Sequence, residues 1–386
     1  MTEAVIVSAV RTPIGTSFKG TLRDTSAEQL ATAVVRAAVE RSGLAPEDVD
    51  DVILAEELAG GGDIARYAAV ASGMTGVPGQ AVNRHCAGSL TAVGNAAATI
   101  RAGMDRVVVA GGAHAASMNP RLSWRVPGSE EPRTGFGPTF PYYEGGNDDV
   151  AVTVGWNTAL EVGITRAEMD AWAKRSHDRA IAAIDAGVFE DEILELDVTV
   201  DGATVRFAVD EHPRRGLTLE KLGTLKPLRE IDGFGITAGN ASGINDAASA
   251  LAIVADDLAT ERGLSVLARV RAWAAVGVEP HRTGMGAVEV IPRVLGRAGI
   301  RASDVDLWEI NEAFASTPIA ACRRLGIDED LVNVHGSGCS LGHPVAASGA
   351  RMLTTLAHEL RRRGGGLAVA AMCAAGGQGG AVVIEA

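Results

Sequence analysis

The sequence repeats part of itself, and this duplication constrains the fold more than any other feature. Residues 41–50 read RSGLAPEDVD, and residues 297–306 read RAGIRASDVD. At the same offset, Glu56 corresponds to Glu312. Further along, three positions recur with a small slip: Asn83, His85 and Ser89 match Asn333, His335 and Ser340. Duplication of one unit is the simplest explanation, and two such units should pack around a pseudo-two-fold axis.

Each copy of the unit alternates strands with helices. Ser26 is a candidate cap for the first helix, and Ser42-Gly43 is its stop signal. We predict strands at residues 5–10, 49–55, 106–110, 266–275, 307–310 and 367–372, and helices at residues 26–41, 65–72, 90–102, 166–186 and 247–258. The alternation is typical of the α/β class and predicts a mostly parallel sheet.

The composition excludes several classes of protein. The chain has 386 residues, of which 47% are apolar, only 4% are aromatic and 47 are glycine; this favours closely packed layers of helix and sheet. The net charge of −13 argues against a nucleic-acid or anionic-membrane partner. No apolar run is long enough to span a bilayer, and the N-terminus reads as a buried strand rather than a signal peptide.

The four cysteines predict a reducing environment. Cys86, Cys322, Cys339 and Cys373 show neither metal-ligand spacing nor a paired framework. We therefore expect a cytoplasmic protein without a metal site.

Cys86 comes just before the apolar helix predicted at residues 90–102. Unpaired backbone N–H groups and the positive end of the helix dipole favour a thiolate over a thiol there. Cys86 is thus either a nucleophile or, as for many lone cysteines, a small buried core residue.

Three later segments place polar residues where strands end. Asn311 follows the strand at 307–310, His343 lies in a glycine-rich approach to a helix, and Cys373 follows the strand at 367–372. Functional sites of α/β proteins usually form at such strand ends. If the two units pack around a shared axis, Cys86 should face the loop that holds His343. Taken singly, however, His343 could be a turn residue, Asn311 a strand-end cap and Cys373 a core residue.

Together these motifs resemble the thiolase family, the acetyl-CoA C-acyltransferases. The similarity covers essentially the whole chain and includes NASGIND at 240–246, NEAFA at 311–315 and LGHP at 341–344. The resemblance implies an α/β fold with five αβαβα layers from two duplicated halves and an inserted loop domain. We place the N-terminal half at 1–113 plus 245–265, the inserted domain at 114–244 and the C-terminal half at 266–386. Residues 119–147, rich in proline and glycine, would form an irregular excursion.

The resemblance implies that the chain cleaves 3-ketoacyl-CoA with CoA, a reversible Claisen condensation. Cys86 would attack the 3-keto carbon and keep the acyl group, because a thiolate is nucleophilic near neutral pH. His343 would take the proton of Cys86, and Asn311 would hold a water that shares an oxyanion pocket. Cys373 would exchange a proton with the acetyl-CoA carbanion. The backbone N–H groups of Cys86 and Ala375 would form a second oxyanion pocket.

An acidic protein that binds CoA needs a local cationic patch. Five basic residues lie between positions 212 and 229: Arg214, Arg215, Lys221, Lys226 and Arg229. By resemblance, Arg214 would contact the nucleotide and Ser242 the pantetheine, with Lys221 and Phe314 also at the CoA site. CoA and acyl-CoA would be substrates, and no cofactor is expected. The alternative is that Lys221, Lys226 and Arg229 belong to a solvated charged helix.

Several residues depart from the pattern of the family. Val150-Ala151 stand where short-chain biosynthetic relatives carry His-Met, and Thr283 stands where they carry Met. Both changes favour a wider acyl pocket, so we expect a degradative thiolase of fatty acid β-oxidation. His114 stands where glutamate is common, and Ala346 and Ala375 replace frequent glycines.

Three alternatives remain open at this point. The first is a biosynthetic acetyl-CoA acetyltransferase that forms acetoacetyl-CoA. The second is a decarboxylating ketosynthase-like enzyme, against which the second cysteine, Cys373, argues. The third is a non-catalytic acyl-CoA-binding protein with a thiolase fold, against which the intact Cys86 argues. The family also suggests a homodimer or homotetramer, with residues 119–147 as a candidate contact.

Overall fold

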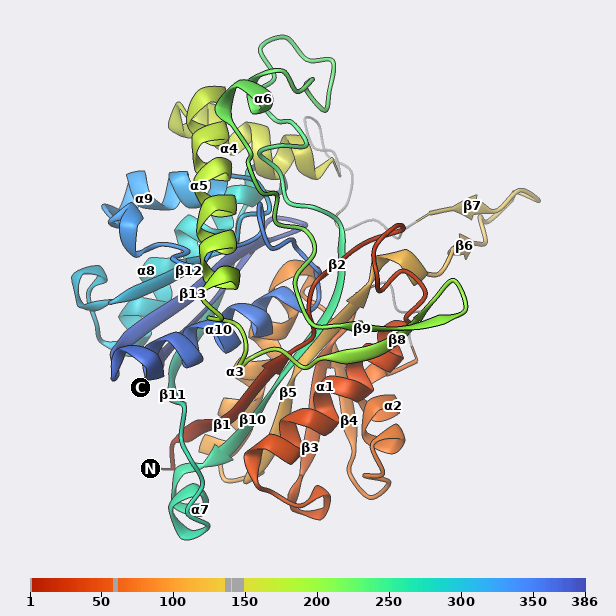
Figure 1. Cartoon of the computed structure of the whole chain (residues 1–386), viewed down its shortest axis with the longest axis vertical. Coiled ribbons are helices and arrows are strands. Elements are labelled where there is room, and N and C mark those ends of the chain that lie inside the picture. The colour runs from red at the N-terminus through yellow and green to blue at the C-terminus, as the bar shows by residue number, and fades with distance from the viewer. Residues whose placement is uncertain (1, 58–61, 136–139, 141–148) are drawn as a thin grey trace.

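The structure, a computed structural model, describes residues 2–57, 62–135, 140 and 149–386 (Figure 1). Within these residues ten strands form one mixed sheet in the order β12-β13-β14-β11-β1-β10-β5-β3-β4, with β2 paired to β10. The strands are β1 (Ala4–Arg11), β2 (Gly15–Thr16), β3 (Asp51–Ala55), β4 (Gly79–Val82), β5 (Val107–Ala115), β10 (Asn245–Ala255), β11 (Ala268–Gly277), β12 (Leu307–Ile310), β13 (Leu367–Ala374) and β14 (Gln378–Glu385).

The predicted duplication is confirmed by the strand order. The run β1-β10-β5-β3 in the first half is repeated by β11-β14-β13-β12 in the second, with the same parallel and antiparallel pairs. β1 and β11 meet antiparallel at the centre, where Val5 lies opposite Arg269 and Ile6 opposite Ala268. The two halves are therefore related by a pseudo-two-fold axis at this junction.

Helices cover the two halves and also separate them. α1 (Ala27–Ser42) and α2 (Ile64–Ala71) pack on the first half, whereas α8 (Gly286–Ala298) and α9 (Ser316–Leu325) belong to the second. α3 (Gly88–Arg101) and α10 (Ser348–Arg363) contact each other and strands of both halves, so they form the middle layer. Three separate hydrophobic clusters fill the spaces between these layers. The predicted αβαβα layering is confirmed.

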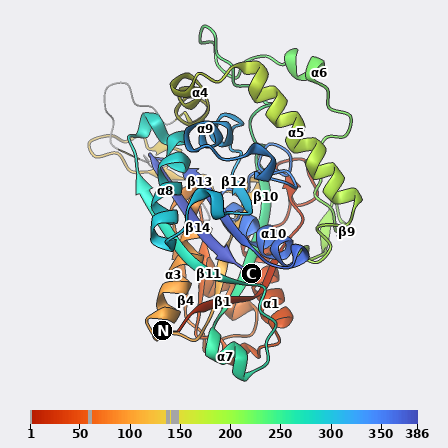
Figure 2. The same ribbon diagram turned by 90° about the vertical axis from the view of Figure 1, so that its left-hand side faces the viewer.

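Three further helices gather at one end of the molecule (Figures 1 and 2). They are α4 (Asn157–Val162), α5 (Arg166–Asp185) and α6 (Leu219–Gly223). The predicted cap of α1 is confirmed, since Ser26 accepts a hydrogen bond from the Gln29 N–H. Gly43 then ends the helix in a left-handed conformation, with φ of 77°.

Two predictions about the sheet were wrong. The helix predicted at residues 247–258 is instead strand β10, followed by the short helix α7 (Asp256–Glu261). All of β10 is buried between β1 and β5, and its alanines suit a strand that is covered by helices on both faces. Because β10 and its counterpart β14 run antiparallel to their neighbours, the sheet is mixed rather than mostly parallel.

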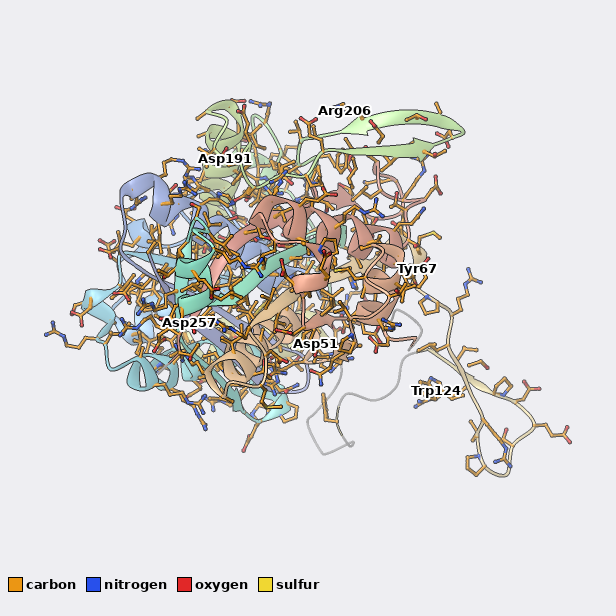
Figure 3. All side chains as sticks on the ribbon, turned by 90° about the horizontal axis from the view of Figure 1, so that it is seen from below. Asp51, Tyr67, Trp124, Asp191, Arg206 and Asp257 are labelled. Carbon is orange, nitrogen blue, oxygen red and sulfur yellow. The ribbon has the colours of Figure 1, made fainter. Side chains whose placement is uncertain are left out.

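The proline- and glycine-rich excursion is described only in part. β6 (Ser123–Trp124) and β7 (Arg133–Thr134) form a hairpin that stands away from the body, with Trp124 at its side (Figures 1 and 3). Residues 136–139 and 141–148 lie outside the described residues. A second hairpin, β8 (Leu196–Val200) and β9 (Ala203–Phe207), lies over the outer face of the first half.

Candidate active site

The N-terminal ends of the two central helices meet. Cys86 lies in a short 3-10 turn, His85–Ala87, directly before α3. The Ala350 N–H of α10 donates to Ser89 Oγ of α3 at 3.0 Å. Gly349 permits this approach, because a Cβ there would come within 2.7 Å of the Leu90 backbone nitrogen. The helix start that carries Cys86 is thereby fixed against the helix start that follows His343.

The end of β13 meets the same point from the other half. Cys373 is buried near the end of this strand, and the 3-10 turn of Cys86 contacts β13. The Ala375 N–H lies near enough to the Cys86 sulfur to lower the pKa of the thiol. Gly377, with φ of 77°, turns the chain back into β14. The structure therefore places Cys86 beside the end of β13, the strand of Cys373, and beside Ala375.

His343 is held in one orientation by its neighbours. Its Nδ1 lies 2.6 Å from Ser348 Oγ, and Ser348 Oγ donates to the Pro344 carbonyl at 2.9 Å. Since the hydroxyl hydrogen of Ser348 is used on Pro344, Nδ1 of His343 must be the donor to Ser348. Nε2 of His343 then carries no hydrogen and can accept a proton.

Asn311 lies beside this acceptor nitrogen. Its Nδ2 is 3.4 Å from His343 Nε2. Its Oδ1 is buried and has no hydrogen-bond partner among the described residues. A buried amide with a free oxygen next to the base suits the binding of a water or a polar substrate atom.

The buried Glu312, next to Asn311 in the chain, fixes this segment through four hydrogen bonds. Its carboxylate accepts from Trp172 Nε1 at 2.8 Å, Ser176 Oγ at 2.6 Å, Asn333 Nδ2 at 2.8 Å and the Cys339 N–H at 3.0 Å. Sequence reasoning noted Glu312 only as a repeat position and missed this role. The match between Glu312 and Glu56 in the two copies indicated the repeat, but it gave no indication of these hydrogen bonds.

Loss of solvation favours the neutral form of the three reactive groups. It raises the pKa of the Cys86 thiol well above its usual value, and the Glu57 carboxylate adds to this, whereas the N–H groups of Ala375 and Cys86 lower it. Burial also raises the pKa of Cys373 to about 12 and lowers the pKa of His343 to about 3. The backbone donors at this helix start favour a thiolate, as the sequence indicated, but loss of solvation acts in the opposite direction on Cys86. These pKa shifts favour a thiol and a neutral imidazole before substrate binds.

The histidines at the repeat positions each bind a glutamate. His85 Nδ1 lies 2.9 Å from Glu57, and His335 Nε2 lies 2.9 Å from Glu359. The sequence left open whether they support the structure or touch a ligand. The pair at Glu57 borders Cys86, whereas the Glu359 carboxylate also accepts from Arg363 on α10.

The residues predicted to bind CoA fall in two groups. The backbone segments of Ser242 and Phe314 lie side by side. The Ser242 N–H donates to the Ala313 carbonyl at 2.9 Å, and Ala241 forms an isolated antiparallel β-bridge with Phe314. Arg214 and Lys221 are exposed, each on a segment that packs against residues 239–243. Within the described residues, Arg214, Lys221 and Lys226 have no ion pair, whereas Arg215 binds Asp185 at 2.5 Å and Arg229 binds Asp149.

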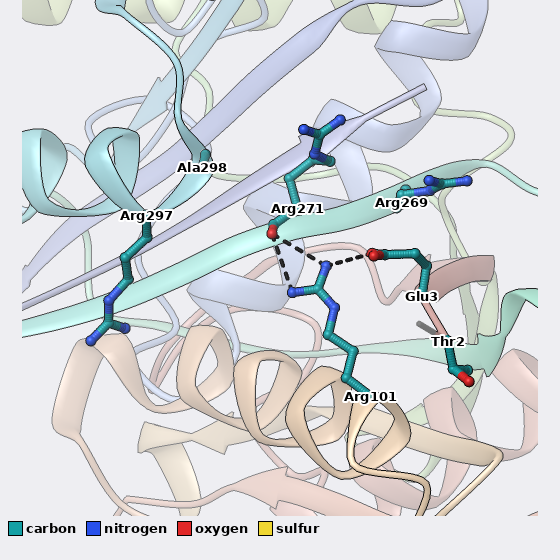
Figure 4. A pocket seen from close by; sticks show the side chains of 7 residues that line it. All are labelled: Thr2, Glu3, Arg101, Arg269, Arg271, Arg297 and Ala298. Carbon is teal, nitrogen blue, oxygen red and sulfur yellow. Dashed lines mark hydrogen bonds and ion pairs between the residues drawn. The ribbon is translucent and has the colours of Figure 1, made fainter.

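A pocket of about 430 Å³ at the opposite end of α3 is unrelated to these residues. It is lined by Thr2, Glu3, Arg101, Arg269, Arg271, Arg297 and Ala298. Arg101 binds Glu3 at 2.8 Å and the Arg271 carbonyl at 3.2 Å, and the arginines do not point to one centre (Figure 4). Among the described residues, no group of three His, Cys, Asp or Glu side chains could hold a metal ion. No helix in the described part of the chain could cross a membrane.

The comparisons with known proteins decide the family. The model of the thiolase N-terminal domain matches residues 4–257, and that of the thiolase C-terminal domain matches residues 264–386. The chain belongs to the thiolase family. It is accordingly an acyltransferase, of a family that acts on acyl-CoA substrates.

Relatives and solved structures agree with this family. An acetyl-CoA acetyltransferase of Escherichia coli K12 is 42% identical and covers 100% of this thiolase and 99% of its own length. The peroxisomal 3-ketoacyl-CoA thiolase 2 of Arabidopsis thaliana is 37% identical over 94% of this chain and 79% of its own. The crystal structure of the Bacillus anthracis acetyl-CoA acetyltransferase superposes with a TM-score of 0.93 at 38% identity, covering 100% of this chain and 99% of the other.

Proposed function

We propose that this thiolase cleaves 3-ketoacyl-CoA with CoA, giving acetyl-CoA and a shortened acyl-CoA through an acyl-Cys86 intermediate. The observation that carries the proposal is the contact of the turn that holds Cys86 with β13, the strand of Cys373, together with the hydrogen bond that joins the start of α3 to the start of α10, the helix that follows His343. A half-buried thiol near a second thiol, with an imidazole at the start of the adjoining helix, suits this chemistry better than passive binding.

The first half-reaction forms the acyl-enzyme. His343 Nε2 takes the proton of Cys86 as the sulfur attacks the 3-keto carbon, so charge develops only when substrate is in place. The carbon–carbon bond then breaks, and the electron pair passes to the thioester oxygen of the departing acetyl-CoA enolate. Asn311 and protonated His343 face this oxyanion. Cys373 protonates the enolate carbon and becomes a thiolate.

The second half-reaction returns the enzyme to its resting state. The Cys373 thiolate takes the proton of incoming CoA, whose sulfur attacks the acyl-Cys86 carbonyl. The N–H groups of Cys86 and Ala375 stabilise the tetrahedral oxyanion. Collapse releases acyl-CoA, and the Cys86 sulfur recovers its proton from His343. Two acid–base groups are needed because two thiols lose a proton: His343 takes the proton of Cys86, and Cys373 takes the proton of CoA.

For the CoA moiety, we assign Arg214 and Lys221 to the phosphates and Ser242 and Phe314 to the pantetheine. The absence of carboxylate partners for Arg214 and Lys221 within the described residues supports the first assignment. The contact between the Ser242 and Phe314 segments supports the second. No metal or other cofactor takes part in this scheme.

For the acyl group, we propose a pocket wider than acetoacetyl-CoA needs and a degradative role in β-oxidation. Residues 151–156, which begin with Ala151 directly after Val150, contact residues 280–285, which hold Thr283. The biosynthetic alternative, formation of acetoacetyl-CoA, is favoured by relatives named acetyl-CoA acetyltransferase. A panel of 3-ketoacyl-CoA substrates separates the two. Higher kcat/KM for chains longer than acetoacetyl-CoA supports the first, and strong preference for acetoacetyl-CoA supports the second.

We also propose that the chain is a homodimer or homotetramer of the cytoplasm. The protruding β6–β7 hairpin, with Trp124 42% exposed, is the candidate contact between subunits. The division into three domains given above remains a prediction as well.

A further inference from the structure

His114 is a buried histidine that the reaction scheme does not use. It lies near the end of β5 and is only 4% exposed. Its Nδ1 is fully buried and has no hydrogen-bond partner among the described residues. Buried imidazoles are normally hydrogen-bonded, so an unpaired one needs a reason.

The side chain of His114 faces the active site. Gly112, two residues earlier on the same face of β5, lies against the loop of His343: a Cβ on Gly112 would come within 2.1 Å of the Ala346 carbonyl. The intervening Ala113 and the following Ala115 belong to the hydrophobic cluster on the opposite face, under α1. The alternation of the strand therefore directs His114 toward the layer of α3 and α10.

Three charged or titratable groups act on His114. They are His343 in the catalytic loop, Glu57 after β3 and Asp246 on β10. Both carboxylates have other partners: Asp246 accepts from Ser17 Oγ at 2.8 Å and the Ser117 N–H at 3.0 Å, and Glu57 binds His85 at 2.9 Å. Neither hydrogen-bonds to His114, so neither explains why an imidazole stands at this position.

We propose that His114 is a positioning residue that sets the proton affinity of His343. This inference rests on the proposed role of His343 as the base for Cys86. When neutral, His114 lets His343 accept a proton; when protonated, its charge opposes a second charge on His343. Burial lowers the pKa of His114, while the carboxylates of Glu57 and Asp246 raise it. Arg351, the other cation that acts on His343, stays charged throughout, so His114 is the neighbour whose charge changes with pH.

The test is to measure how the rate of Cys86 alkylation by iodoacetamide depends on pH. The reaction is monitored by the mass of the peptide that contains Cys86. His114→Gln keeps the size and hydrogen-bonding capacity without a titrating group. It removes the positive charge that opposes protonation of His343, so the fall of the alkylation rate at acid pH should begin at a higher pH. His114→Glu adds a negative charge that stabilises protonated His343, so this fall should begin at a still higher pH. Shifts of about one pH unit correspond to a tenfold change in proton affinity.

Two controls make the outcome decisive. His358→Gln, on the far part of α10 where His358 binds the Ala9 carbonyl, should leave the alkylation profile unchanged. Superimposable profiles for wild type, His114→Gln and His114→Glu, in variants that retain wild-type melting temperatures, overturn the inference about His114. A wild-type enzyme that forms no acyl adduct with 3-ketoacyl-CoA overturns the proposed function instead.

Discussion

At the residue scale, the hydroxyl of Ser348 decides which nitrogen of His343 is free. Ser348→Ala removes the acceptor for Nδ1–H, so the ring loses its fixed tautomer and orientation. We expect kcat to fall by about tenfold, the equivalent of about 1–1.5 kcal/mol for one hydrogen bond. KM should change little, because the hydroxyl of Ser348 is bonded to His343 and Pro344 and is not assigned to CoA. Steady-state thiolysis kinetics measure both. The exposed Ser303→Ala is the matched control, and an equal loss in both variants would contradict the role of Ser348.

The buried histidines also give stability a pH dependence. The pKa values of His343 and His177 are lowered from 6.5 to about 3 in the folded chain, mainly by burial. Between these values the unfolded chain binds more protons, so the free energy of unfolding falls as pH drops below about 6.5. We expect the urea midpoint to decrease from pH 7.5 to pH 5.5, about one pH unit on either side of the pKa of free histidine.

His177→Gln tests this linkage. The variant lacks one of the two histidines whose pKa is lowered to about 3, so its urea midpoint should decrease less than that of the wild type over the same pH range. His177 Nδ1 accepts the Arg214 N–H at 3.1 Å, and glutamine can replace this acceptor. Equal decreases in the two proteins would show that His177 does not contribute.

At the element scale, β5 can approach the catalytic loop only because position 112 has no side chain. In Gly112→Ala the Cβ would lie 2.1 Å from the Ala346 carbonyl and 3.0 Å from the Ala55 Cβ, so the loop of His343 must move. We expect a loss of about 1–3 kcal/mol in the free energy of unfolding and a lower kcat. Urea denaturation and thiolysis assays measure these effects.

Gly296→Ala is the control for this substitution. Gly296 lies inside α8 and is exposed, and nothing lies within 4 Å of its added Cβ. Here alanine should stabilise the enzyme by about 0.5–1 kcal/mol, because it favours the helix. If Gly112→Ala behaved like Gly296→Ala, the close contact between β5 and the catalytic loop would be wrong.

The elements also show where sequence reasoning succeeds. The caps of α1 follow from local rules, and Ser26 and Gly43 were predicted correctly. β10 was predicted as a helix because its alanine-rich run has the propensity of one, and only its burial between β1 and β5 makes it a strand. The repeat contained the missing signal, because β10 occupies the place of β14 in the other half.

At the scale of the whole molecule, the duplication predicted which distant segments meet. Cys86, His343, Asn311 and Cys373 were identified from motifs. The fold places the turn of Cys86 against the strand of Cys373, and Asn311 Nδ2 3.4 Å from His343 Nε2. The groups around them could not be predicted in the same way. Ser348 and Glu312 act through hydrogen bonds whose partners are distant in sequence or depend on loop geometry. The raised pKa of Cys86 depends on its loss of solvation, which only the packed structure reveals.

The assembly proposal makes a prediction at the same scale. A single chain has a mass of 39.7 kDa, and we expect light scattering in solution to give two or four times that mass. Truncation of the β6–β7 hairpin, which protrudes from the body, should reduce a tetramer to a dimer without unfolding the subunit. A monomer that is fully active would contradict the proposed assembly.

The most direct test of the account is the covalent state of Cys86 during turnover. The enzyme is mixed with a 3-ketoacyl-CoA in the absence of free CoA, quenched and digested, and the masses of all four cysteine peptides are measured. We predict an acyl group on Cys86 alone, removed on addition of CoA and absent in Cys86→Ser. An adduct on another cysteine, or thiolysis that continues in Cys86→Ser, would contradict the central claim.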